Sequence, residues 1–195
     1  MKSISKVPLI VFIVGIMLVL SVFFISFSSI FSSFKPVENI TAAKNLADQY
    51  IVENYPLLEV EEMMEFSNNF YVIAKETSSQ NSALELLIDR NSGRIYQEPG
   101  PNMMWNTKYD HHGRLETPTT VMPIDSEEAV MIAQDWLNNN FFGKRVEETS
   151  IFYGYYTMDF GEKEQIFGML SVNGYSGEVW YHSWHGDFIL MMEYD

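Results

Sequence analysis

An internal repeat constrains this chain most, because two copies of one short unit limit the folds that it can adopt. The segments ITAAKNLADQYIVEN and DSEEAVMIAQDWLNN both place apolar residues at i, i+3, i+4 and i+7. This spacing predicts an amphipathic helix lying on a core. An offset of 86 residues aligns Ala43 with Ala129 and Ala47 with Ala133. The second segment opens with the D-x-x-E pattern of a capping box at Asp125, which predicts a helix start there.

The repeat continues beyond the helices into segments with strand-like patterns. The same offset aligns the VEE triplets at 60–62 and 146–148, and an offset of 84 then aligns Ser92-Gly93 with Ser176-Gly177. The slip of two residues falls between strands, where turn length is free to vary. An ordered series of helix, VEE, aromatic strand and SG turn indicates that one ancestral unit was duplicated.

Each copy is predicted to be one helix followed by an antiparallel meander, which is an α+β fold. In the first strand, apolar and mostly acidic residues alternate, so one face should be apolar and the other acidic. The apolar face is expected to hold Leu58, Val60, Met64 and Phe66, and the other face Glu59, Glu61, Met63 and Glu65. The chain then divides into an N-terminal segment at 1–34, a first repeat at 35–98, a linker at 99–123 and a second repeat at 124–195. Copies this small bury little surface alone, so we expect them to pack together.

This plan resembles the PepSY domain, named for peptidase propeptides and a spore-germination membrane protein. The resemblance depends on the AxxLA pattern of Ala43, Leu46 and Ala47, the aromatic strand near Phe70-Tyr71, and LLIDRNSGRIY at 86–96. The second copy contributes AVMIAQDWL and LSVNGYSGEVW. The resemblance implies an exported, non-catalytic module that often inhibits or regulates a peptidase, sometimes in tandem behind one membrane helix. Residues 99–123 match nothing in the family pattern, and no functional residue carries over.

The N-terminal segment contains a long apolar run. Residues 7–31 include no ionisable side chain, and a helix of that length spans roughly 37 Å, enough for a bilayer core of about 30 Å. Lys2 and Lys6 precede the run and an acidic region follows it, which favours a cytoplasmic N-terminus and an extracytoplasmic remainder. A cleaved signal peptide is the alternative, but the run is too long and SSIFSSF is a poor cleavage site. We therefore expect a single-pass membrane protein.

The charge and composition of the remaining residues exclude several functions. Residues 35–195 hold all 26 acidic residues and ten of the twelve basic ones, a net charge of −16. Such a field repels phosphate backbones, so we expect no nucleic-acid partner. The absence of cysteine excludes disulfides, thiolate nucleophiles and cysteine metal sites. Stability must therefore come from an apolar core.

The linker at 99–123 interrupts the repeat with four prolines and a cluster of aromatic, methionine and histidine residues. Prolines forbid regular structure through most of it, and a connection this long in a compact domain is usually functional or ordered by packing. One interpretation is that Met103, Met104, Trp105 and Tyr109 seal the interface between the copies.

A soft-metal site is the alternative interpretation of the methionines and histidines. Thioether and imidazole ligands suit Cu(I), and an exported protein without cysteine could use them. The candidates are Met103, Met104, His111, His112, His182, His185, Met191 and Met192. His182 and His185 would face opposite ways on a strand, so they converge only if the chain bends near Gly186.

Aromatic side chains suggest a third possibility, a ligand or peptide groove between the copies. Its candidate residues are Trp105, Tyr109, Trp180 and Trp184, although core packing explains each one taken singly. Catalysis is not expected, because the paired acids point apart on strands and Ser176 lies in a predicted turn without G-x-S-x-G. The sequence thus predicts a membrane-anchored extracytoplasmic binding or regulatory module, acting on an exported peptidase or another envelope protein, with copper binding as the alternative.

Overall fold

The computed structural model describes residues 35–109, 118–163 and 165–194. The described chain holds two α-helices of 15 residues each, α2 (Ile40–Asn54) and α4 (Ser126–Asn140), and one short helix, α3 (Pro101–Met104). Asn39 and Asp125 cap the two long helices, because each side chain accepts a hydrogen bond from a backbone N–H three residues later. Both amphipathic helices therefore lie where the spacing predicted them.

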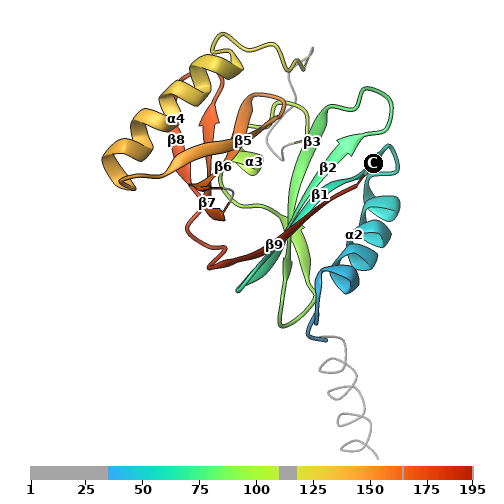
Figure 1. Cartoon of the computed structure of the whole chain (residues 1–195). Coiled ribbons are helices and arrows are strands. Elements are labelled where there is room, and N and C mark those ends of the chain that lie inside the picture. Colours follow the sequence, from blue (N-terminus) through green and yellow to red (C-terminus); the bar gives the residue numbers. More distant parts are fainter. Residues whose placement is uncertain (1–34, 110–117, 164, 195) are drawn as a thin grey trace, which may run out of the picture. The chain divides into compact units, whose positions relative to one another are not determined.

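The strands form two antiparallel sheets. The first sheet has the order β4-β3-β2-β1-β9, and the second has the order β5-β6-β7-β8 (Figure 1). The strands of the first repeat are β1 (Leu58–Phe66), β2 (Asn69–Glu76), β3 (Ser82–Asp89) and β4 (Ile95–Gln97). Those that follow are β5 (Arg145–Ile151), β6 (Tyr155–Glu162), β7 (Gln165–Asn173), β8 (Val179–Tyr181) and β9 (Phe188–Glu193).

The expected α+β class is wrong, because the described chain is mostly β, with two antiparallel sheets and only a few helices. The prediction treated each repeat as a helix covering its own sheet. In the structure β9 leaves the second repeat and pairs with β1 of the first, Glu62 opposite Glu193 and Met64 opposite Met191. None of the helices in the described part of the chain is long and apolar enough to cross a membrane. The span expected at 7–31 lies outside the described residues.

From residue 36 on, the described residues form one unit with three cores in layers. Helix α2 covers one face of the first sheet, the second sheet faces its other side, and α4 covers the far face of the second sheet (Figure 1). The middle core contains apolar side chains from both sheets: Met64, Phe66, Tyr71, Ile73, Leu87, Phe152, Tyr155, Ile166 and Met169. Since both faces of β2 and β3 are covered, nearly all of their side chains are buried.

A β-bulge interrupts the alternation that was expected along β1. Pairing with β2 shifts register between Val60 and Glu62, so one extra residue sits in the strand. Val60 and Met63 consequently face the core under α2, whereas Met64 faces the second sheet. The residues expected on one face are therefore divided between two. The β5–β6 pair has the same shift between Val146 and Glu148, the corresponding place in the second repeat.

The SG turns of the two repeats have the same geometry. Gly93 and Gly177 have φ angles of 68° and 73°, a conformation that favours glycine. Their backbone N–H groups donate to the carbonyls of Asp89 and Asn173, whose side chains cap the same turns. The aligned SG dipeptides thus fold alike.

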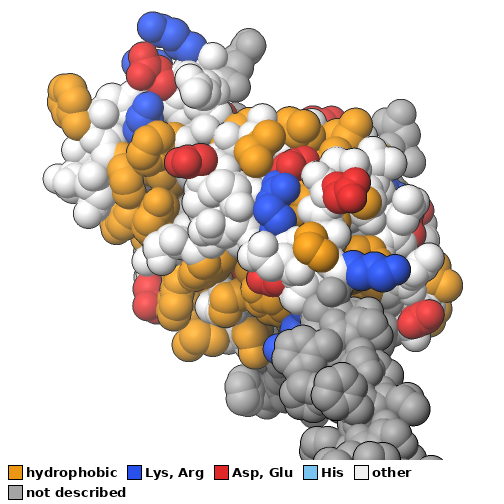
Figure 2. Space-filling view, turned by 90° about the horizontal axis from the view of Figure 1, so that it is seen from below, with side chains coloured by type: hydrophobic (Ala, Val, Ile, Leu, Met, Phe, Trp, Pro, Cys, Tyr) orange, Lys and Arg blue, Asp and Glu red, His pale blue; other side chains and the backbone are white. Residues whose placement is uncertain are grey.

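Apolar side chains also reach the surface of the described chain. On the face in Figure 2 they are interspersed with charged and other polar side chains. The most exposed are Leu57, Val121 and Phe142. These residues belong to three separate loops.

Candidate metal centre

Two histidines and a glutamate converge where the ends of β4 and β8 meet. Glu98 follows β4, and His182 and His185 occupy the turn between β8 and β9. Glu98 and His182 are equivalent at the offset of 84, and their backbone N–H groups donate to the equivalent residues Glu85 and Met169. The duplicated meander therefore brings the same position of each repeat to one place.

The three side chains are almost fully buried and close enough to share one ion. Glu98 is 0% exposed, and His182 and His185 are each 2% exposed. One ligand atom from each lies within 4.8 Å of the others. Glu98 Oε1 is 3.3 Å from His182 Nδ1 and 3.1 Å from His185 Nε2. Within the described structure neither nitrogen is aligned for a hydrogen bond, and Glu98 Oε2 also has no hydrogen-bond partner.

Hydrogen bonds fix the tautomer of His185. Asn69 Nδ2 donates to the carbonyl of Trp184, which leaves Asn69 Oδ1 facing His185 Nδ1 at 2.9 Å. An amide oxygen can only accept, so His185 Nδ1 carries the proton. In the neutral ring, Nε2 then turns its lone pair toward Glu98.

A relay of hydroxyl groups fixes His182 in the same sense. Thr157 donates its only hydroxyl proton to Glu85 at 2.7 Å, so Ser171 must donate to Thr157 at 2.8 Å. Ser171 therefore accepts from His182 Nε2 at 2.9 Å, which places the proton on Nε2 and the lone pair on Nδ1. When neutral, both histidines thus aim a lone pair at the Glu98 carboxylate, an arrangement that is repulsive unless a proton or a metal ion lies between them.

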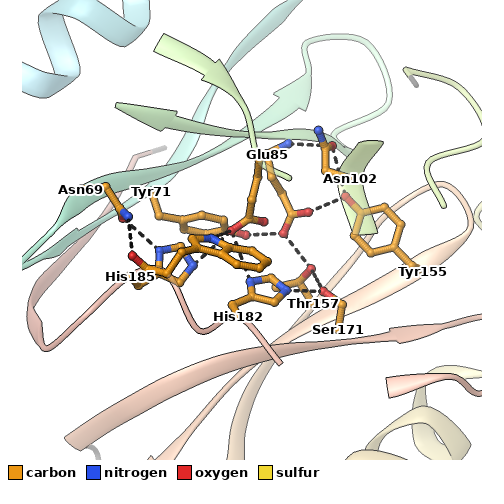
Figure 3. A network of polar contacts seen from close by, with 11 residues as sticks. Asn69, Tyr71, Glu85, Asn102, Tyr155, Thr157, Ser171, His182 and His185 are labelled. Carbon is orange, nitrogen blue, oxygen red and sulfur yellow. Dashed lines mark hydrogen bonds and ion pairs between the residues drawn. The ribbon is translucent and has the colours of Figure 1, made fainter. Parts of the chain in front are cut away.

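The relay ends at Glu85, a second buried carboxyl group on β3 (Figure 3). Tyr71 of the first sheet and Tyr155 of the second both donate to it at 2.6 Å. Asn102 of α3 accepts from the Glu85 backbone N–H at 3.1 Å and lies 3.3 Å from the Tyr155 hydroxyl. The network joins both sheets and the linker around the candidate centre.

The two carboxyl groups have opposite pKa shifts. Burial raises the pKa of Glu85, and the charge of Glu98 adds to this, giving about 7. Burial alone would raise the pKa of Glu98 too, but His182 and then His185 lower it to about 2. Burial opposes the charged form of both rings, yet Glu98 raises the pKa of His182, whereas burial leaves the pKa of His185 lowered. Glu98 is thus ionised at neutral pH.

Trp184 covers the centre on one side. Its indole N–H donates to Glu98 Oε1 at 3.1 Å, and its ring stacks on His182 with centroids 4.9 Å apart. Beside the histidines lies a pocket of about 460 Å³, also lined by Phe167 and Phe188. The centre is therefore enclosed by protein but adjoins a route by which an ion could reach it.

The other predicted metal ligands lie elsewhere. Met104 is 59% exposed, and Met103 lines a separate pocket with Arg94 and Tyr96. His111 and His112 lie outside the described residues. His182 and His185 do converge, because the chain leaves β8 at Tyr181 and turns before β9.

The aromatic residues predicted to line a groove do not form one site. Trp105 packs edge-on against Trp180 with centroids 6.0 Å apart, next to the core between the sheets. Tyr109 packs against the core under α2, and its hydroxyl donates to Glu76 at 2.7 Å. Trp184 instead belongs to the candidate centre.

Sequence reasoning missed Glu98 and Glu85, which are single acidic residues in an acidic chain. The signal that could have found Glu98 is the repeat itself, because the offset of 84 places it on His182.

Comparison with protein-family models, curated proteins and solved structures finds no match to this chain. The PepSY resemblance and the regulatory role that it implies stay predictions.

Proposed function

We propose that this protein binds a divalent transition-metal ion at Glu98, His182 and His185. The observation that supports this most is the convergence of three buried ligand atoms that lack aligned hydrogen bonds. Hydrogen bonding of the outer imidazole nitrogen is the usual way in which proteins orient a histidine ligand. Here Asn69 accepts from the outer nitrogen of His185, and Ser171 accepts from the outer nitrogen of His182.

The ligand types favour zinc over the Cu(I) that the sequence offered as an alternative. Two imidazoles and one carboxylate suit Zn²⁺, whereas Cu(I) prefers sulfur, and the three converging residues supply none. Zinc is commonly held by three protein ligands with a further position for water or another ligand. The pocket beside the histidines is lined by both rings and has room for such a ligand.

An ion at this centre would couple the two sheets. Glu98 follows the edge strand of the first sheet, and the two histidines lie on the segment that leaves the second sheet to become β9. Binding would therefore hold the crossing segment against the first repeat. We infer that metal occupancy controls how firmly the two repeats are joined, which suits a binding or regulatory module.

Thermal unfolding with added ZnCl₂ tests the proposal. The full chain, purified in mild detergent because of the apolar run at 7–31, is compared with His185→Gln and Glu98→Gln. At a hundredfold excess over the dissociation constant, zinc should stabilise the folded protein by about 2.7 kcal/mol. For a chain of this size that raises the midpoint by about 5–11 °C. A chelator should reverse the shift.

The variants decide where the ion binds. His185→Gln and Glu98→Gln should each lose most of the shift, whereas a Met103→Leu and Met104→Leu double variant should keep it. If either variant fails to fold, the chelator-reversible shift of the unaltered chain is measured beside that of the methionine variant. If zinc does not stabilise the chain, His182 serves only as a buried partner of Glu98, and the proposal is wrong.

A further inference from the structure

A second pocket, lined by none of the proposed metal ligands, lies where β1, β5 and the end of β9 meet. It has a volume of about 440 Å³. Its walls include Glu61 and Glu62 of β1, Glu148 of β5 and Glu193 of β9. Both repeats and the crossing strand therefore contribute carboxyl groups to one hollow.

The charges that line the pocket are unbalanced. Lys75 is the one basic residue among its described lining residues, and its ammonium group lies 3.9 Å from Glu59, which is outside the lining. Glu61 accepts a hydrogen bond from Ser82 at 2.8 Å, which leaves its charge uncompensated. The pocket thus keeps an excess of negative charge.

Glu62 is the residue that points to a ligand. It is only 6% exposed, and its Oε1 has no hydrogen-bond partner within the described structure. A buried carboxyl oxygen without a donor is unfavourable unless something binds it. Burial raises the pKa of Glu62 to about 8, and Glu148, Asp159, Glu193 and Glu61 add to the shift. Other charged or titratable groups at this pocket are Lys75 and Tyr194.

The spacing of these carboxylates excludes a simple metal site. Among the described residues, only Glu98, His182 and His185 bring three such ligand atoms close enough for one ion. An organic cation fits separated carboxylates better than a metal ion, because its ammonium groups and their N–H donors are carried on a flexible chain. Apolar wall atoms from Ile151 and Tyr194 suit the methylene groups of such a chain.

We propose that this pocket binds an alkylammonium group, with Glu62 as the buried acceptor and Glu148 and Glu193 around it. The group could belong to a free polyamine or to a lysine side chain of a peptide, which present the same chemistry. Binding would bring a cation between β1 and β5, and so would join the two repeats at a place other than the metal centre.

Isothermal titration calorimetry at pH 8.5 and 150 mM NaCl tests the proposal on the full chain. The probes are spermidine, a blocked glycine-lysine-glycine peptide, and CaCl₂. Glu62→Gln removes the buried acceptor, and Glu147→Gln is the control, because Glu147 is an exposed acid of β5 outside the pocket lining. Spermidine, the peptide or both should bind, with affinity at least tenfold weaker in Glu62→Gln and within twofold of the original in Glu147→Gln.

The two ammonium probes distinguish the source of the ligand. Tighter binding of spermidine supports a free polyamine, and tighter binding of the peptide supports a protein partner. The proposal is overturned if neither probe binds, if CaCl₂ binds more tightly than both, or if Glu62→Gln and Glu147→Gln behave alike. If Glu62→Gln does not fold, Glu193→Gln serves in its place with the same expected loss.

Discussion

The Tyr155 hydroxyl group should contribute more to stability than an ordinary tyrosine hydroxyl. Tyr155 donates to the buried carboxylate of Glu85 at 2.6 Å, and its ring stacks on Phe152 with centroids 4.9 Å apart and planes 8° apart. Tyr155→Phe removes the donor and keeps the ring. Because the pKa of Glu85 is raised to about 7, the comparison is made at pH 8.5, where the carboxyl group is ionised. A hydrogen bond to a charged group contributes about 1.5–3 kcal/mol, so Tyr155→Phe should lower the free energy of unfolding by that amount.

Tyr156→Phe is the matched control. The Tyr156 hydroxyl donates to the neutral backbone carbonyl of Ile124 at 2.7 Å, so its loss should cost about 0.5–1.5 kcal/mol. Urea unfolding followed by tryptophan fluorescence measures both variants, with equal m-values as the check that the folded and unfolded states are unchanged. If Tyr155→Phe costs no more than Tyr156→Phe, Glu85 is not held as a charged acceptor and our reading of the relay is wrong.

Three further predictions concern acid stability, a tight turn and the core under α4. Burial opposes ionisation of Glu76, but hydrogen bonds, that from Lys108 foremost, lower its pKa from the ordinary value of 4.5 to about 2. The stability that this shift contributes is present above pH 4.5 and is lost as the pH falls toward 2. Lys108→Met should therefore make the loss of stability in acid smaller, as measured by urea unfolding at several pH values. Gly154→Ala should destabilise by at least about 2 kcal/mol in thermal unfolding, because φ is 105° and the new Cβ would lie 2.3 Å from the Trp105 carbonyl oxygen; an unchanged midpoint would contradict the geometry. Leu137→Ala should cost about 2–5 kcal/mol in urea, because this side chain of α4 is 0% exposed, and a loss below 1 kcal/mol would mean that α4 is loosely packed.

The helices and turns could be predicted because their signals are local. Apolar spacing placed α2 and α4, the D-x-x-E pattern placed the cap at Asp125, and the SG dipeptides marked turns whose glycines need positive φ. Each signal depends on residues within about two helical turns of one another, so one sequence is enough to see it.

The sheet arrangement could not be predicted in the same way. In the described structure the first repeat has no strand equivalent to β9, so the duplication could not predict this strand. Its pairing with β1 joins residues far apart in the sequence. The bulge at Val60 and Glu62 reverses the pleat of β1, which a pattern of strict alternation cannot anticipate. Both errors come from long-range pairing.

The candidate metal centre was predicted only in part. His182 and His185 were among the sequence candidates, but their carboxylate partner comes from the other repeat. The clustering of methionines in the sequence favoured copper, whereas the buried side chains that converge in the structure offer nitrogen and oxygen ligands. Whether potential ligands lie close together depends on the fold, and the sequence alone does not show it.

X-ray absorption at the zinc edge of the zinc-loaded full chain tests the metal centre most directly. We expect nitrogen and oxygen neighbours at about 2.0–2.2 Å, with the outer-shell scattering of two imidazoles from His182 and His185. A sulfur neighbour at about 2.3 Å, or zinc surrounded by oxygen alone, would contradict the assignment to Glu98, His182 and His185.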